Sequence, residues 1–313
     1  MSGIQVVAPG LLTTVQDLGR EGFGPMGVSA SGAADAIALR LGNRLLGNAE
    51  EAAGLEMTLL GGAFLFPEGG VIALTGSDFG PTLEGAPVEM WSSVKVESGQ
   101  TLRIGSTRSG ARCYLCVQGG ICVEDFLGSA STHLLSGLGG LEGRALRKGD
   151  VLRCGPATTP FTKRRLAPQA LQHLAPRKAL RVTDGPQSDW FPESSQASFY
   201  TSAYRVAEES NRMGLRLEGS PLTNASGGRM ITEGVALGAI QVPESGQPIV
   251  LFVEQQTTGG YPKIANVIAA DLPSVGQLRP RDEVRFERVE MEAARGLFLA
   301  QEALLASEDL ILE

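Results

Sequence analysis

Histidine and aromatic residues are scarce in this chain, and that scarcity narrows the chemistry open to it. Its 313 residues include two histidines, His133 and His173, and aromatic side chains make up 5% of the composition. Two histidines exclude most multi-histidine metal sites and leave little scope for a histidine-based catalytic triad. We therefore expect no metal site, and we expect His133, which follows Ser131 and Thr132, to be a solvated loop residue.

Cysteine is also rare, with four residues, of which Cys113 and Cys116 form a C-x-x-C pattern. The surrounding segment, 112–117, is typical of a strand. Residues three apart on a strand point to opposite faces, so these two sulfurs would not converge on one metal ion. We interpret them as buried, reduced structural cysteines.

The chain has no long apolar run and no excess of positive charge. Its formal net charge of −7 offers no electrostatic footprint for nucleic acid or an anionic membrane. The apolar runs are broken by glycine or charge, and the first ten residues have no basic segment followed by a hydrophobic core. These features predict a cytoplasmic protein without nucleic-acid or membrane partners.

Glycine, by contrast, is abundant at 41 residues, which is typical of many short strands joined by tight turns. We expect a mainly β, barrel-like architecture with few helices. The clearest helix is 33–46, whose apolar residues recur at helical spacing before Gly47 and Asn48, and a closing helix is predicted over 288–305. Strand candidates in the first half are 4–7, 71–75, 88–91, 101–104, 112–118 and 150–153.

A weak internal repeat divides the chain into two halves. Segment 114–120 resembles 250–260, and each is followed by a Leu-Arg-x-x-Asp pattern, at 146–153 and 278–285. The intervening 156–177 is rich in proline and has no strand pattern, as in a linker. The sequence therefore predicts an N-terminal domain over 1–165 and a C-terminal domain over 166–313 that ends in the closing helix.

Polar residues interrupt the C-terminal half in two places. The apolar strand 250–253 ends in Glu-Gln-Gln-Thr-Thr-Gly-Gly, and a second polar insert, 208–214, separates strand candidates 204–207 and 215–217. A strand that ends in polar residues and glycines lets a ligand approach the backbone. We expect the two inserts to face one cleft. A helix predicted over 261–270 would point its N-terminus at the ligand and favour a carboxylate or another anion.

Several motifs, taken together and in order, resemble the biotin-dependent carboxyltransferase family, also called allophanate hydrolase subunit 2. The resemblance covers nearly the whole chain. It implies two tandem cyclophilin-like β-barrel domains. The motifs are TVQDLGR at 14–20, GAAD at 32–35, Gly128-Ser129 with Ser131-Thr132, SNRMG at 210–214, and GAIQVP at 238–243 through QTTGGYP at 256–262.

The family includes proteins of different function, and the features of this chain favour one of them. The chain has no biotin-acceptor Met-Lys context, no Walker-type phosphate loop and no second family module. The resemblance therefore implies the C subunit of ATP-dependent 5-oxoprolinase, which hydrolyses 5-oxo-L-proline to L-glutamate together with subunits A and B. ATP would serve the complex, and this chain would carry no biotin. The alternatives are a carboxyltransferase component of a urea-carboxylase-like enzyme and a regulatory antagonist of a sporulation kinase inhibitor.

The same resemblance implies roles for individual residues. Asn211 would grip the amide, with Arg212 as a cation for a carboxylate or phosphate. Lys263 and Glu254 would handle protons or balance charge, and Glu254 replaces the aspartate expected there. The remaining pocket residues would be Gln241, Gln256, Thr257, Thr258, Gly259, Gly260 and Tyr261.

Structural roles for four of these residues stay open at this point. Asn211 and Arg212 could cap a turn, Gln241 could be a buried amide bonded to backbone, and Lys263 could be solvated.

Overall fold

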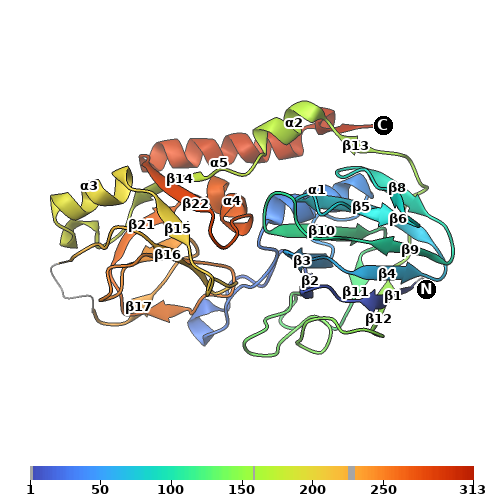
Figure 1. Cartoon of the computed structure of the whole chain (residues 1–313), viewed down its shortest axis with the longest axis horizontal. Helices are drawn as coiled ribbons and strands as arrows, with labels where there is room; N and C mark the ends of the chain where they lie inside the picture. Colours follow the sequence, from blue (N-terminus) through green and yellow to red (C-terminus); the bar gives the residue numbers. More distant parts are fainter. Residues whose placement is uncertain (1–2, 158, 225–229) are drawn as a thin grey trace. The chain divides into compact units, whose positions relative to one another are not determined.

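The computed structural model describes residues 3–157, 159–224 and 230–313, and its chain divides into two compact units (Figure 1). Unit 1 comprises Met1–Arg20, Ser31–Ala175 and Leu305–Glu313, and unit 2 comprises Glu21–Ala30 and Pro176–Leu304. Each unit therefore includes a short segment from the other half of the sequence. The main division follows Ala175, and the domain division 1–165 and 166–313 stays a prediction.

Unit 1 is built from two antiparallel sheets that share one core (Figure 1). The core takes side chains from both sheets, among them Phe64, Leu74 and Leu115. The first sheet has the order β11-β12-β1-β4-β9-β6-β7, with bounds Ile121–Cys122, Val151–Cys154, Gly3–Ala8, Ala63–Phe66, Gln100–Arg103, Thr82–Leu83 and Ala86–Pro87. The second has the order β2-β3-β10-β5-β8, with bounds Leu12–Gln16, Gly54–Thr58, Arg112–Val117, Gly70–Gly76 and Ser93–Val96.

Strand β10 contributes side chains to two separate cores because its residues alternate between faces. Cys113 packs in the core between the sheets, whereas Cys116 packs with residues of helix α1, Ala36–Leu45, on the opposite face. This confirms the predicted strand and the predicted divergence of the two sulfurs. The predicted helix over 33–46 is also confirmed, starting after Asp35, whose carboxylate caps it by accepting the N–H of Ala38.

A buried carboxylate ties the start of α1 to the second sheet. Glu56 on β3 accepts hydrogen bonds from the Tyr114 hydroxyl at 2.7 Å and from the Ala34 N–H at 2.8 Å, and it pairs with Arg112 at 3.4 Å. Burial, and then the negative charge of Glu56, raise the pKa of Tyr114 well above its usual range. The phenol therefore stays protonated and keeps donating to Glu56.

His133 is buried at 7% exposure, so the expectation of a solvated loop residue is wrong. The reason is the loop that carries it, which folds over Asp17. The hydroxyls of Ser129 and Ser131 donate to the Asp17 carboxylate at 2.7 and 2.5 Å, and the Ala130 N–H donates to it at 2.7 Å. The sequence of this loop is typical of a polar surface segment. In the structure its polar groups donate hydrogen bonds to a buried carboxylate.

Unit 2 is centred on a closed barrel of seven strands (Figure 1). Their order is β14-β21-β18-β19-β16-β15-β22, and β22 closes the barrel by pairing in parallel with β14. The bounds are Ala179–Asp184, Lys263–Val267, Ala239–Gln241, Ile249–Leu251, Gly214–Glu218, Tyr204–Val206 and Glu283–Arg288. The predicted mainly β, barrel-forming fold is confirmed.

Short elements complete the two units. Strands β17, Glu233–Gly234, and β20, Thr258–Gly259, pair to form a two-stranded arm in unit 2. The remaining helices are α2 Pro168–His173, α3 Glu193–Thr201, α4 Leu272–Gly276 and α5 Met291–Ala306, with single 3-10 turns at Gly24–Met26, Ser188–Trp190, Ala269–Asp271 and Glu308–Leu310.

Two predicted elements are wrong. Segment 261–270 contains strand β21 instead of a helix, because its backbone pairs with β14 on one side and β18 on the other. Because a strand lies here in place of the helix, the predicted binding of an anionic ligand at the helix N-terminus loses its basis. Segment 88–91 forms no strand, since it lies between β7 and β8 and Trp91 adopts a φ of 59°. The closing helix is confirmed as α5, on which the apolar Met291 and Phe298 are exposed.

The last residues of the chain are part of unit 1. Strand β23, Ile311–Leu312, pairs with β13, Arg165–Leu166, and the carbonyl of Leu310 accepts the N–H of Ala167 at 2.9 Å. Leu310 is buried, whereas Leu312 is exposed.

We expect Leu310→Ala to lower the free energy of unfolding by about 2–4 kcal/mol, because it leaves a cavity beneath the C-terminal strand. Leu312→Ala is the matched control and should change it by less than about 0.5 kcal/mol. Urea denaturation measures both values, and equal effects of the two variants would show that the terminal segment does not pack as described.

The cysteines should differ sharply in reactivity with a thiol reagent. Cys122 is exposed, while burial raises the pKa of Cys116 to about 12 and that of Cys154 to about 11, and raises the pKa of Cys113 as well. Because the thiolate is the reactive form, we expect Cys122 to react at least about tenfold faster than the other three in the folded protein. Ellman's reagent measures this, and Cys122→Ser should remove the fast phase. A fast phase that survives this substitution would contradict the assignment.

Candidate functional site

Four neighbouring barrel strands place Arg216, Ile249, Gln241 and Lys263 in one row. Ile249 on β19 pairs with Arg216 on β16 and with Gln241 on β18. Gln241 pairs in turn with Lys263 on β21, directly after a β-bulge-like register shift between Ile240 and Gln241. Residues directly opposite each other in antiparallel strands lie on the same face of the sheet. The row therefore presents a cation, an apolar side chain, an amide and a second cation on one side.

Part of this row lines a pocket of about 340 Å³. The pocket brings together four residues predicted from the sequence, Asn211, Gln241, Gln256 and Tyr261. Its other lining includes the polar Arg216 and Ser245 and the apolar Met213, Ile249 and Leu251. Neutral hydrogen-bonding groups above an apolar floor are suited to a small polar molecule with a flat face.

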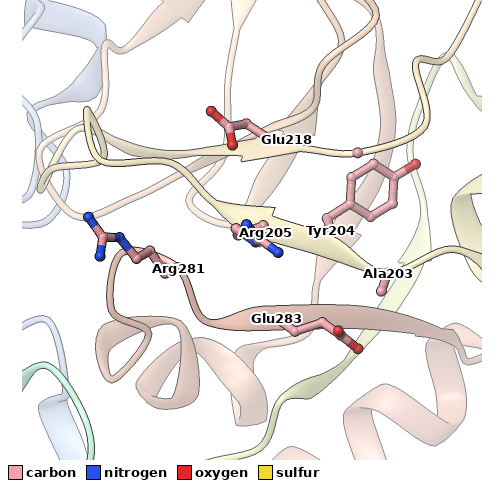
Figure 2. Close-up of a pocket in the computed structure, with 7 residues that line it drawn as sticks. Ala203, Tyr204, Arg205, Glu218, Arg281 and Glu283 are labelled. Atoms are coloured by element: carbon pink, nitrogen blue, oxygen red, sulfur yellow. The ribbon is translucent and has the colours of Figure 1, made fainter.

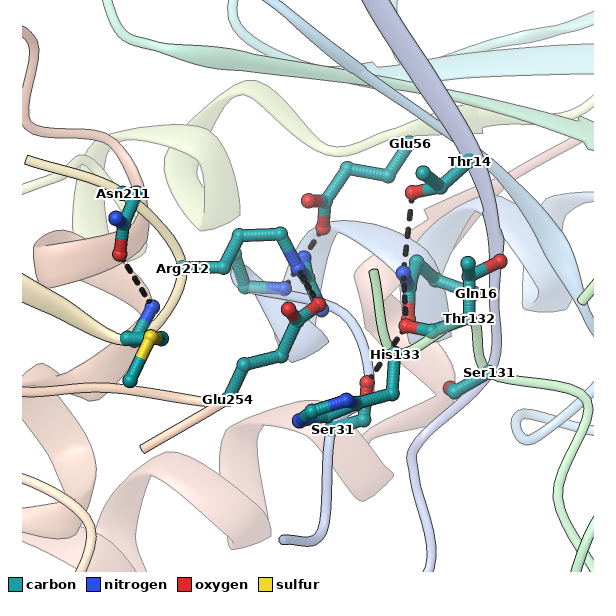
Figure 3. A network of polar contacts seen from close by, with 12 residues as sticks. Thr14, Gln16, Ser31, Glu56, Ser131, Thr132, His133, Asn211, Arg212 and Glu254 are labelled. Atoms are coloured by element: carbon teal, nitrogen blue, oxygen red, sulfur yellow. Dashed lines mark hydrogen bonds and ion pairs between the residues drawn. The ribbon is translucent and has the colours of Figure 1, made fainter. Parts of the chain in front are cut away.

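Asn211 uses one end of its amide to hold a turn and lines the pocket as well. Its side-chain Oδ1 accepts the backbone N–H of Met213 at 2.8 Å (Figure 3). The backbone N–H of Asn211 donates to the carbonyl of Gly214 at 3.2 Å. The turn role left open by the sequence is therefore present. Because the oxygen is engaged, the side-chain NH₂ is the group that Asn211 can offer to a ligand.

Arg212 and Glu254 form a buried ion pair and do not line the pocket. The Arg212 Nε lies 2.5 Å from a Glu254 carboxylate oxygen, and the Glu254 N–H donates to the Arg212 carbonyl at 2.9 Å (Figure 3). Removing one partner of such a pair costs about 3–5 kcal/mol, because the other charge is left buried. The pair thus joins the two polar inserts on which Asn211 and Gln256 lie. It holds these two inserts in position relative to each other.

Lys263 is 3% exposed, which removes the solvated alternative. Its Nζ lies 2.5 Å from Oε1 of Glu233, and that oxygen also accepts Nε2 of Gln187 at 3.1 Å. The hydrogen bonds from Lys263 and Gln187 hold the pKa of Glu233 below its ordinary value. Lys263 shares the row with Gln241, but its ammonium is held by the arm.

Gln241 is the most unusual side chain of the pocket. It is 1% exposed, and within the described part of the chain its Nε2 has no hydrogen-bond partner, while its Oε1 accepts Nε2 of Gln256 at 3.4 Å. A Cβ on Gly259 would lie 2.3 Å from this Nε2, so a larger residue there would displace the end of the Gln241 side chain. An unpaired buried donor costs about 1–3 kcal/mol, so this amide is the first candidate in the pocket for a contact with a ligand.

The remaining predicted residues belong to the arm. Thr258 and Gly259 form β20 opposite Gly234 and Glu233. The carbonyl of Thr257 accepts the Val235 N–H at 3.1 Å, and that of Gly260 accepts the Met230 N–H at 3.0 Å. These four residues, Thr257, Thr258, Gly259 and Gly260, act through their backbone to build the arm.

A second hollow of about 400 Å³ lies on the same barrel, over β15, β16 and β22 (Figure 2). Arg205 lies there between Glu218 and Glu283, which are its register partners on the two neighbouring strands. Alternating charges across exposed strands stabilise a solvent-facing sheet. The first pocket is the better candidate because it contains the buried unpaired amide.

Neither a metal centre nor a membrane span emerges from the described residues. Among them, no group of three or more His, Cys, Asp or Glu side chains could hold a metal ion. The helices described are also too short or too polar to cross a bilayer.

Sequence reasoning missed Arg216, Ser245 and Glu233. Arg216 could have been found, because strand alternation in 215–217 places it on the opposite face from the two leucines. Ser245 lies in the turn that the Gly246 N–H closes onto the Pro243 carbonyl. Glu233 had no local signal, because its partners Gln187 and Lys263 are distant in the sequence.

Comparison with known proteins connects this geometry to a family. The model of the carboxyltransferase domain, subdomain A and B, matches residues 26–288. The chain is 38% identical to the 5-oxoprolinase C subunit of Escherichia coli over 291 residues, 93% of each chain. It is also 38% identical to the 5-oxoprolinase C subunit of Haemophilus influenzae over 284 residues, 91% of this chain and 90% of the other.

A solved structure with this fold also matches the chain. The crystal structure of the K. lactis urea amidolyase matches with a TM-score of 0.90 and 33% identity, covering 99% of this chain and 21% of that one. The match therefore spans this chain almost completely and one part of a much longer protein. On the evidence of its sequence and its fold, this chain belongs to the carboxyltransferase domain family, subdomain A and B.

Proposed function

We propose that this chain is the C subunit of an ATP-dependent 5-oxoprolinase and that it acts with subunits A and B to hydrolyse 5-oxo-L-proline to L-glutamate. The observation that carries the proposal is the 38% identity to the C subunits of two 5-oxoprolinases over at least nine-tenths of each chain. The pocket supports it, because its polar groups suit a planar amide.

The substrate has three features that need partners: an amide oxygen, an amide N–H and a carboxylate. In our proposal the Gln241 Nε2 and the Asn211 NH₂ donate to the amide oxygen, where negative charge develops when water attacks the ring carbonyl carbon. Arg216, on the same row as Gln241, pairs with the carboxylate. Tyr261 and Gln256 close the pocket and orient the ring.

Hydrolysis breaks the ring C–N bond, adding the hydroxyl of water to carbon and a proton to nitrogen. A lactam is a poor electrophile, and ATP supplies the activation of its oxygen within the complex. The task of this chain is to fix the amide plane and to stabilise charge on its oxygen with neutral donors. Lys263 is our candidate for proton transfer or charge balance; it does not line the pocket but is the register partner of Gln241, which does.

A urea-carboxylase-like carboxyltransferase is the second candidate, favoured by the TM-score of 0.90 to the K. lactis urea amidolyase. Urea is also a planar amide and would suit the same donors. It has no carboxylate, however, and would leave Arg216 without a ligand partner. The identity to this relative, 33%, is also below the identity to the 5-oxoprolinase proteins.

Copurification with subunits A and B, followed by an assay of 5-oxoproline-dependent ATP hydrolysis, tests the proposal directly. We expect turnover from the three proteins together. Inactivity of the full set on 5-oxoproline, with activity on urea and carboxybiotin, would replace our proposal by the second candidate.

Asn211→Asp separates the two roles of that residue. Aspartate keeps the oxygen that accepts the Met213 N–H but loses the NH₂ group, so we expect unchanged folding and assembly and a fall in turnover of about a hundredfold or more. Asn211→Ala should abolish turnover and also lower the free energy of unfolding by about 1 kcal/mol, through loss of the turn bond. If Asn211→Asp keeps full turnover in the assembled complex, the role of Asn211 is structural and limited to holding the turn.

Gln241→Met tests whether the unpaired amide is retained for function. The variant keeps the shape but removes the buried donor, so the free energy of unfolding should stay constant or rise by about 1 kcal/mol. Turnover should fall by about tenfold to a hundredfold. Gln247→Met is the control, since Gln247 binds the backbone of Gly219 outside the pocket and should not affect turnover. A destabilised but active Gln241→Met would show the amide to be structural.

A further inference from the structure

Glu233 stands out as a partly exposed carboxylate that meets a buried ammonium. The Lys263 side chain is 3% exposed and the Glu233 side chain 42% exposed, yet Nζ and Oε1 lie 2.5 Å apart. A lysine is rarely buried unless an opposite charge compensates it. Glu233 supplies that charge from outside the barrel.

Gln187 also holds the contact between Lys263 and Glu233. Its Nε2 donates to Oε1 of Glu233 at 3.1 Å, and its Oε1 accepts the backbone N–H of Lys263 at 3.2 Å. One side chain therefore binds both members of the pair. The Glu233 carboxylate and the Lys263 backbone are thus fixed relative to each other.

The arm brings Glu233 to this place. Glu233 lies on β17 opposite Gly259 on β20, and Gly259 covers the unpaired Nε2 of Gln241. Gln241 is in turn the register partner of Lys263. The arm thus meets the row at two adjacent positions, with a carboxylate over the ammonium and a glycine over the amide.

We propose that Glu233 is a positioning residue, which holds the Lys263 ammonium in one place on the barrel strand next to Gln241 and so fixes where Lys263 acts in the reaction. This inference rests on the proposed function in so far as Lys263 takes part in turnover. The placement of the ammonium by Glu233 is independent of it.

The arrangement has a chemical purpose in the proposed reaction. An unanchored lysine samples many rotamers, whereas proton transfer requires a donor at hydrogen-bond distance in a fixed direction. The contacts from Lys263 and Gln187 also lower the pKa of Glu233, so the carboxylate stays charged at neutral pH. Its hold on Lys263 is present above the ordinary glutamate pKa and is lost as the pH falls through the lowered one.

Amine acylation of the isolated chain tests the placement without any assay of activity. With N-hydroxysulfosuccinimide acetate at neutral pH and peptide mass spectrometry, the reaction of Lys263 is compared with that of Lys178, whose side chain is 64% exposed. We expect the Lys263-to-Lys178 ratio to be well below one in the native chain. In Glu233→Gln it should rise by about fivefold or more, because the ammonium loses its partner.

Two variants control the measurement. Glu233→Asp keeps the charge on a shorter side chain and should return the ratio part of the way to the native value. Glu283→Gln removes a carboxylate of an exposed pair with Arg285 on β22 and should leave the ratio unchanged. A native Lys263 that reacts as fast as Lys178, or a ratio unaffected by Glu233→Gln, would overturn the proposal.

The reconstituted complex then tests whether the placement serves turnover. We expect Glu233→Gln to lower kcat by about tenfold with little change in KM, and Glu233→Asp to recover part of it. Altered labelling with unaltered kcat would overturn the positioning role. If the native complex shows no 5-oxoproline-dependent turnover, the proposed function fails, and the labelling ratio still decides whether Glu233 places Lys263.

Discussion

The pairing register of four barrel strands is the constraint on which the candidate site depends. It sets Arg216, Ile249, Gln241 and Lys263 in a row, so side chains from separate stretches of sequence face the same way. A shift of one residue in any of these strands would turn its member of the row to the other face. Because the barrel is closed, such a shift would also have to be absorbed by the neighbouring strands, which keeps the row in place.

Each unit contains a buried carboxylate that is paired with a buried arginine. In unit 1, Glu56 is held by Arg112 and by the Tyr114 hydroxyl. In unit 2, Arg212 pairs with Glu254. Such pairs contribute little net stability compared with apolar residues of the same shape, but they are costly to break singly. In unit 1 the pair joins two neighbouring strands, and in unit 2 it joins the two polar inserts at the pocket.

Gln241, unlike these paired charges, has a buried polar group without a partner among the described residues. This group is its amide nitrogen, and Gly259 leaves room for it where a larger residue would displace it. An unsatisfied donor weakens a fold unless something outside the protein satisfies it. The fold thus bears a local cost at the position where our proposed substrate presents its amide oxygen, in keeping with a site organised for binding rather than for stability.

The sequence by itself determined the mainly β character, the helix at 33–46 and the divergence of Cys113 and Cys116, because these depend on local periodicity and composition. Asn211 and Gln241 were indicated by the motifs that resemble the carboxyltransferase family. Sequence reasoning misjudged 261–270, whose short apolar spacing suits a helix or a strand, since the choice is made by pairing with β14 and β18. Only the tertiary structure joined Arg212 to Glu254 and Lys263 to Glu233 and placed Arg216 beside Gln241. These contacts link residues far apart in the chain, and barrel closure and strand register, rather than neighbouring residues, decide which of them meet.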